Sequence, residues 1–197
     1  MPPTFAVAVV AEINLDIVVG GLHGLPVMGT EQLVNGVILT SGSSRVLTAL
    51  GLTALGLRIA RLGLVGDDPF RRNMPARLDA AGSDRTGSRG RRGRDGADRN
   101  QRHPLWPHDR AVVTFPCAIA HFGIAHVRFD VLRRCRYMYL PSYVWQEALR
   151  SAAPLLLWRP HAASLTTSVD TDHDPSERWA IGGLLDQVDL FLLRRLS

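Results

Sequence analysis

The residues from Ser41 to Phe70 constrain the fold most strongly, because they contain a complete turn, helix, strand and second turn (SGSSRVLTALGLTALGLRIARLGLVGDDPF). The small residues over 41–44 precede an apolar helical run, whose first N–H groups lack partners within the helix and suit a polar or anionic ligand. Residues 58–65 predict a buried strand, and Gly-Asp-Asp-Pro over 66–69 predicts a turn. This order is typical of an α/β crossover, and a crossover without any ligand explains it as well.

The rest of the chain alternates between predicted strands and helices, which favours an α/β fold with a largely parallel sheet. We expect strands at 5–10, 110–115, 137–140, 165–169 and 188–193, and helices at 70–81, 130–136, 146–158 and 182–187.

Two short extended runs, 17–19 and 32–40, come before the first helix and flank a glycine-rich loop. A plain doubly wound sheet would not place two strands there, so we expect a small β-flap beside the main sheet. Just before the first run, Asn14 and Asp16 alternate with apolar residues, which puts both side chains on one face at the end of a strand. Ligands gather at such strand ends in α/β sheets, although a strand-capping turn explains the pair equally well.

The charge is concentrated in one segment. All 23 basic residues of the chain are Arg, and residues 83–104 contain seven of them against three Asp, which gives this segment a charge of +4 out of +5 for the chain. We expect this Arg/Gly-rich segment to be a disordered insertion. The absence of Lys excludes a Walker-type phosphate loop and Schiff-base chemistry. Two Cys and no apolar run of membrane-spanning length indicate a reduced, cytoplasmic protein.

Other candidate sites are weaker. Asp170, Asp172 and Asp174 would share one face of an extended segment and could hold a divalent cation, but an acidic loop before a helix is the simpler interpretation. His and Cys residues lack zinc-site spacing, and no G-x-S-x-G elbow occurs, so we expect no metal site and no serine hydrolase. Cys117 could be a nucleophile or a small core residue.

Taken in order, these segments resemble the ribokinase-like (PfkB-type) carbohydrate kinases. The matching pieces are AEINLDIVV over 11–19, SGSS and TALGLTALG within 41–56, and LGLVGDDPF over 62–70. SVDTDHDP over 168–175 and VDLFL over 188–192 look like later elements of that fold. The resemblance implies a three-layer αβα domain with a small β-flap, over residues 12–40, that closes over a sugar.

The resemblance also implies ATP-dependent phosphorylation of a sugar or nucleoside, with Mg²⁺ and a catalytic Asp as base. By position, Asp16 would bind sugar hydroxyls, Asn14 would support that site, and Gly42 and Ser43 would form a turn against the sugar. Such a site rejects analogues that lack a hydroxyl. The implied partners are a small-molecule sugar and a second copy of the chain bound through the flap, with no membrane.

Several positions depart from the family pattern. Leu47 stands where a sugar-contacting Asn is expected, Arg71 replaces a Gly, and Asp172 replaces the Asn of a D-x-N element. LLRRLS stands where an N-x-x-E segment is expected, and no G-A-G-D element, which would supply the anion hole and the catalytic Asp, follows. We therefore expect a single incomplete domain over 1–197, without the C-terminal ATP-binding part, without catalytic residues and without kinase activity of its own.

Two alternatives remain open. A non-catalytic sugar-binding or interaction module would use the same flap without phosphoryl transfer. An RNA-binding protein would act through the Arg/Gly segment, but no aromatic residue is interleaved there before Trp106, so we expect no nucleic-acid partner.

Overall fold

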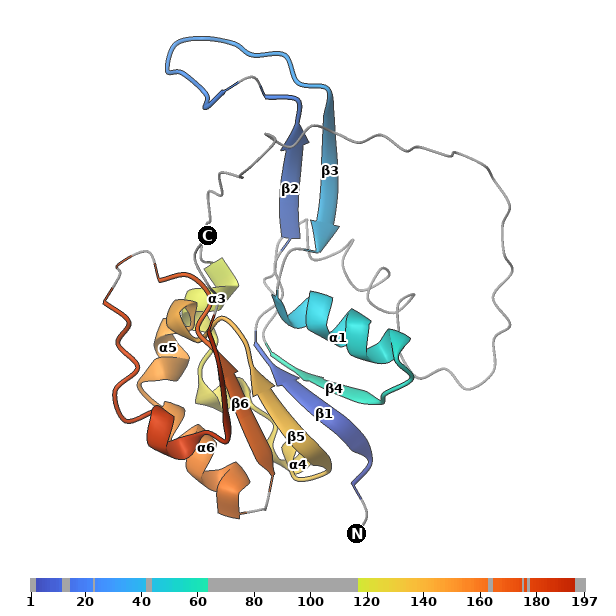
Figure 1. Ribbon diagram of the computed structural model, residues 1–197, viewed down its shortest axis with the longest axis vertical. Helices are drawn as coiled ribbons and strands as arrows, with labels where there is room; N and C mark the ends of the chain where they lie inside the picture. Colours follow the sequence, from blue (N-terminus) through green and yellow to red (C-terminus); the bar gives the residue numbers. More distant parts are fainter. Residues whose placement is uncertain are drawn as a thin grey trace. The chain divides into compact units, whose positions relative to one another are not determined.

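The computed structural model describes residues 3–11, 15–22, 24–41, 44–63, 117–162, 165–174, 176 and 178–193. These residues form two compact units (Figure 1). The first contains a five-stranded sheet and the helices, and the second contains a two-stranded sheet.

The first unit is built on a parallel sheet whose strands follow the order β4-β1-β5-β6-β7. Val7 of β1 pairs with Ile59 of β4 on one side and with Tyr137 of β5 on the other. Apolar and β-branched residues dominate β1 and the carboxyl half of β5, as expected of strands buried on both faces. The strands are β1 (Phe5–Val10), β4 (Ile59–Leu62), β5 (Cys135–Leu140), β6 (Thr166–Asp170) and β7 (Leu190–Leu192).

Helices cover both faces of this sheet, which gives three layers (Figure 1). On one face lies α1 (Ser44–Ala54), which packs against β1 and β4 through the buried Val46 and Ala49. On the other face, Met138 and Leu140 of the sheet form the main core with Leu149, Leu156 and other buried residues of the helical layer. That layer contains α3 (Cys117–His121), η2 (Ile124–His126), α4 (Phe129–Leu132), η3 (Tyr143–Trp145), α5 (Glu147–Arg150) and α6 (Ala153–Ala162), and η4 (Leu185–Gln187) contacts α6.

The second unit pairs β2 (Leu15–Gly20) with β3 (Gly36–Ser41). The Asn35 backbone N–H donates to the Gly20 carbonyl (3.0 Å) and closes the pairing beside the connecting loop. This two-stranded sheet is separate from the main one, as the sequence predicts for the flap.

The predicted α/β class and parallel sheet are confirmed, but several element boundaries are wrong. The expected helix over 146–158 is divided into α5 and α6, because Pro154 is tolerated only in the first turn of a helix and therefore starts a new one. The expected helix over 130–136 ends at Leu132, because the residues from Cys135 pair with β1. The predicted helix at 70–81, the strand at 110–115 and the Arg/Gly segment lie outside the described residues. Within the described part of the chain, no helix is long and apolar enough to cross a bilayer.

Candidate functional site

The connectivity of the sheet identifies where a ligand would bind. From β1 the chain passes through β2, β3 and α1 to β4 on one side of β1, whereas β5, β6 and β7 follow on its other side. The direction of winding therefore reverses between β1 and β5. In open α/β sheets, ligands bind outside the carboxyl ends of the strands at such a switch point.

At the carboxyl ends of β5 and β6, four side chains form a connected carboxylate network, which we define as Tyr139, Ser142, Asp170 and Asp172. The Tyr139 hydroxyl donates to Asp170 Oδ2 (3.1 Å), and the Ser142 hydroxyl donates to Asp172 Oδ2 (3.3 Å). The Asp172 backbone N–H donates to Asp170 Oδ1 (2.9 Å) and links the two pairs. Each carboxylate oxygen can accept two hydrogen bonds, so Asp170 retains acceptor capacity for a ligand hydroxyl.

The backbone at this network adopts an uncommon conformation. Ser142 and Asp172 both have positive φ, 53° and 58°, a region that non-glycine residues enter at an energetic cost. Their side chains are hydrogen-bonded to each other across neighbouring strands, which helps to hold both loops in place. Strained backbone of this kind persists only where the surrounding structure holds it, and it clusters at functional sites.

Electrostatics keeps the phenol of Tyr139 protonated. Burial raises its pKa well above the ordinary value, and the negative charge of Asp170 and the hydrogen bond to it raise it further. A hydrogen bond with the side chain of Thr48, which belongs to α1, lowers the pKa of Tyr139. Tyr139 is therefore a fixed donor that orients Asp170, and it brings α1 into the same polar cluster.

A second buried contact fixes α1 against the end of β1. Arg45, in the first turn of α1, is 3% exposed, and its guanidinium donates to the carbonyl oxygen of Ala11. Gly63 lies against both partners, and a Cβ added there would overlap the Ala11 oxygen and the Arg45 guanidinium. Sequence analysis did not identify Arg45; the available signal was a cation in the first helical turn, where the helix dipole disfavours it.

The acidic segment after β6 does not form the cation site that an extended conformation would allow. Asp172 is left-handed, so the three Asp residues do not share one face. Asp174 instead closes the following loop: its Oδ1 accepts from the Ser176 backbone N–H (2.8 Å) and hydroxyl (2.7 Å), and its Oδ2 accepts from the Trp179 N–H (2.7 Å). These hydrogen bonds hold the pKa of Asp174 below its usual range. No group of three His, Cys, Asp or Glu residues in the described ranges could hold a metal ion.

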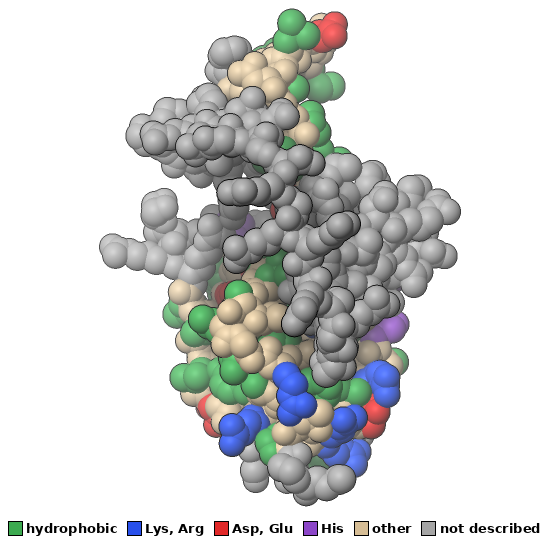
Figure 2. Space-filling view, turned by 90° about the vertical axis from the view of Figure 1, so that its right-hand side faces the viewer, with side chains coloured by type: hydrophobic (Ala, Val, Ile, Leu, Met, Phe, Trp, Pro, Cys, Tyr) green, Lys and Arg blue, Asp and Glu red, His purple; other side chains and the backbone are tan. Residues whose placement is uncertain are grey.

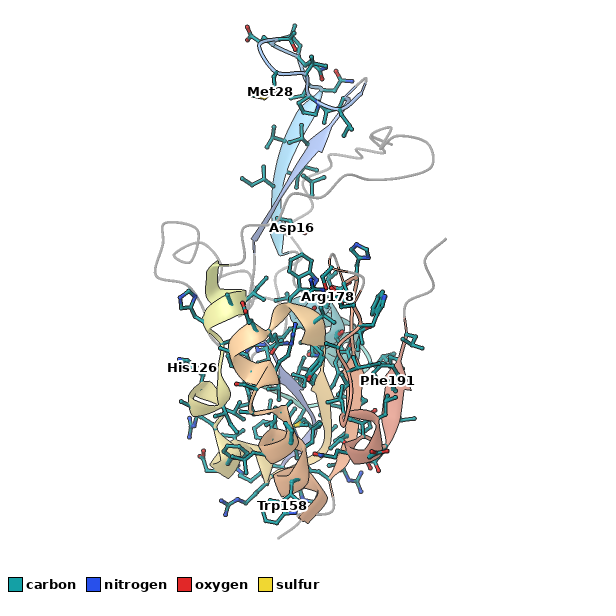
Figure 3. All side chains as sticks on the ribbon, turned by 90° about the vertical axis from the view of Figure 1, so that its left-hand side faces the viewer. Asp16, Met28, His126, Trp158, Arg178 and Phe191 are labelled. Carbon is teal, nitrogen blue, oxygen red and sulfur yellow. The ribbon has the colours of Figure 1, made fainter. Side chains whose placement is uncertain are left out.

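The residues predicted to bind sugar are only partly described. Asp16 is exposed at the second position of β2, in the two-stranded unit (Figure 3). Asn14, Gly42 and Ser43 lie outside the described residues, so their grouping with Asp16 stays a prediction. Leu47, which replaces the expected Asn, is 59% exposed on α1.

No family model and no curated protein matches the chain. Solved structures do match it. A PfkB protein from a Polaromonas species superposes with a TM-score of 0.66 at 17% identity, over 96% of this chain and 65% of that one. Arabidopsis thaliana ribokinase, complexed with ribose and ATP, superposes with a TM-score of 0.64 at 18% identity, over 98% of this chain and 60% of that one. Xylella fastidiosa fructokinase with bound ATP superposes with a TM-score of 0.59 at 16% identity, over 87% of this chain and 49% of that one.

These similarities establish the ribokinase-like fold and confirm the fold that the sequence resemblance implied. The chain spans between about half and two thirds of the length of these solved structures.

Proposed function

We propose that this chain provides the sugar-binding part of an ATP-dependent carbohydrate kinase. The observation that carries the proposal is the carboxylate network at the ends of β5 and β6, next to the switch point of a ribokinase-like fold. Carboxylates in this position suit a polyhydroxylated ligand, because each accepts directional hydrogen bonds from hydroxyl groups.

The described residues have distinct roles in this proposal. Asp170 accepts a hydrogen bond from a sugar hydroxyl, while the buried Tyr139 remains protonated and fixes the orientation of its carboxylate. Ser142 holds the neighbouring Asp172. By family resemblance, Asp16 is also proposed to accept a hydrogen bond from a sugar hydroxyl.

The solved kinases are longer than this chain, so phosphoryl transfer is proposed for the whole protein and sugar binding for this chain. In the full reaction, a sugar hydroxyl oxygen attacks the γ-phosphorus of ATP, its proton passes to a base and ADP leaves. No group of three acidic, His or Cys residues in the described ranges could hold a metal ion, and we assign no step of the transfer to these residues.

Calorimetric titration with ribose and with fructose tests the proposal. We expect saturable binding of one of these sugars, weakened about 10- to 100-fold by Asp170→Asn, which removes a charge-assisted hydrogen bond worth about 1.5–3 kcal/mol. Asp186→Asn, a carboxylate change in η4 outside the network, is the matched control and should leave the affinity unchanged. Equal affinities of Asp170→Asn and the unsubstituted chain would refute the role of the network.

A coupled ATPase assay on the same samples separates the two candidate functions. Sugar-dependent ATP turnover by this chain would make it a kinase by itself. Binding without turnover would favour the second candidate, a non-catalytic sugar-binding module.

The flap also supports the homodimer proposal. Both of its strands expose apolar side chains, with Ile17 at 56%, Val37 at 58% and Ile38 at 50% exposure. A two-stranded sheet is marginally stable by itself, so covering one of its apolar faces with a second flap would stabilise it. Light scattering after size exclusion should give a dimer mass, and Ile17→Asp with Val37→Asp should give a monomer. A monomeric mass for the unsubstituted chain would contradict the proposal.

A further inference from the structure

Arginine side chains gather at the amino-terminal edge of the five-stranded sheet, opposite the carboxylate network. Arg58 precedes β4, Arg133 and Arg134 precede β5, and Arg136 is the second residue of β5. We call these four residues the arginine edge. Figure 2 shows several Arg side chains gathered at the lower end of its view.

Backbone hydrogen bonds bring the segments of the arginine edge onto neighbouring strands. The Ala6 N–H donates to the Arg58 carbonyl (2.8 Å), and the Thr4 N–H donates to the Arg134 carbonyl (2.8 Å). Strands are spaced by about 4.8 Å, so Arg58 and Arg134 begin two strands that lie roughly 10 Å apart across β1. The four residues therefore lie at the starts of two strands, one on each side of β1.

The charges of the arginine edge are available to a ligand. All four side chains are exposed, and none forms an ion pair with a carboxylate in the described part of the chain. By contrast, the nearby Arg128 pairs with Asp130, with its Nη2 2.7 Å from the carboxylate oxygen.

Arg134 is already held in one orientation. Its Nε and Nη2 both lie 3.3 Å from the Thr4 hydroxyl, and its guanidinium lies 5.6 Å above the centre of the Phe5 ring. A side chain that is fixed before binding loses less conformational entropy when it binds. The parallel N–H donors of a guanidinium group also match the oxygens of a phosphate group, whereas the ammonium group of a lysine lacks this fork geometry.

An exposed aromatic ring lies at the same end of this unit. Trp158 of α6 is 65% exposed, and Figure 3 shows it at the lower end of the unit, where α6 ends before β6 begins. Exposed rings beside a row of cations are typical of surfaces that bind single strands, because the ring stacks on a base while the cations contact phosphates.

We propose that the arginine edge and Trp158 form a binding surface for single-stranded nucleic acid. Arginine contacts the phosphates without sequence preference, and Trp158 stacks on one base. This surface belongs to the folded unit and is separate from the proposed sugar site.

Fluorescence anisotropy of the full chain with a labelled 15-nucleotide oligothymidine tests the proposal over a range of salt concentrations. Four phosphate contacts predict a slope of log affinity against log salt of about −3, since each contact on a single strand contributes roughly −0.7. The triple substitution Arg58→Gln, Arg133→Gln and Arg136→Gln should reduce this slope by about 2 and the affinity at least about tenfold at low salt.

The matched control removes three charges from the Arg/Gly segment, as Arg89→Gln, Arg91→Gln and Arg92→Gln. If binding is lost in this control and kept in the arginine-edge variant, the proposal is overturned in favour of the segment.

Trp158→Leu should weaken single-strand binding by a factor of about 5 or more, because stacking on one base is worth roughly 1–3 kcal/mol. Binding to phosphatidylserine vesicles but not to the oligonucleotide would also overturn it.

Discussion

Gly63 provides the most direct test of the packing between α1, β1 and β4. A methyl group at this position would overlap both the Ala11 carbonyl oxygen and the Arg45 guanidinium. Gly63 has no positive φ, so the reason for glycine here is steric and not conformational. Both neighbours are held in place, because Arg45 is buried and the Ala11 N–H donates to the Leu62 carbonyl (3.0 Å).

The expected loss for Gly63→Ala has two parts. Moving Arg45 away from Ala11 removes a hydrogen bond from a charged donor, worth about 1.5–3 kcal/mol. Forcing a methyl group into a filled space adds about 1–3 kcal/mol. The sum, about 2.5–6 kcal/mol, is a large fraction of the roughly 5–15 kcal/mol that stabilises a typical domain.

Gly51→Ala is the matched control for this substitution. Gly51 is exposed inside α1, and a Cβ there would meet nothing within 4 Å. Alanine favours the helix over glycine by roughly 0.5–1 kcal/mol, so this variant should be more stable than the unsubstituted chain. Urea unfolding followed by far-ultraviolet circular dichroism would measure both changes. If Gly63→Ala unfolds at the same urea concentration as the unsubstituted chain, the steric argument is refuted.

Three further predictions concern titratable groups of the first unit. The pKa of Asp174 is lowered in the folded protein, chiefly by the Ser176 hydroxyl, so its stabilising contribution is present above the ordinary value near 3.8 and is lost as the pH falls through the folded pKa. The difference in unfolding free energy between the unsubstituted chain and Asp174→Ala should therefore shrink between pH 6 and pH 3; an unchanged difference would contradict this. Because burial raises the pKa of Tyr139, the unfolded chain loses this proton first, and stability should decline as the pH rises above about 10. Tyr139→Phe should remove part of that alkaline decline, and no difference between the two alkaline unfolding curves would count against the assignment. Burial raises the pKa of the Cys135 thiol to about 11, so a Cys117→Ser variant should show no rapid reaction with Ellman's reagent at pH 8 until denaturant is added. Rapid labelling of the native variant would show that Cys135 is accessible.

Local patterns in the sequence predicted the strands at the centre of the sheet. The run Phe5–Val10 is apolar along its whole length, and such a run is typical of an inner strand of a parallel sheet, which is buried on both faces. The two extended runs before α1 predicted a separate flap, because no helix lies between them. These inferences succeed because burial and periodicity are properties of consecutive residues.

Element ends were predicted less well, because they depend on tertiary contacts. Periodicity indicated one helix over 146–158, but only the position of Pro154 within a packed turn decided where α5 ends and α6 begins. For the acidic segment after β6, the sequence left an extended cation site and a loop open, with the loop as the simpler interpretation. Hydrogen bonds from Ser176 and Trp179 to Asp174 form that loop.

What the sequence alone determined is the class of the fold: alternating strands and helices, a parallel sheet, a flap and a ribokinase-like order of segments. What only the tertiary structure decided is which polar groups meet. Tyr139 and Asp170 are 31 residues apart and Ala11 and Arg45 are 34 apart. Neither pair leaves a local signal, because strand register and crossover direction bring them together, and both are set by packing of the whole sheet.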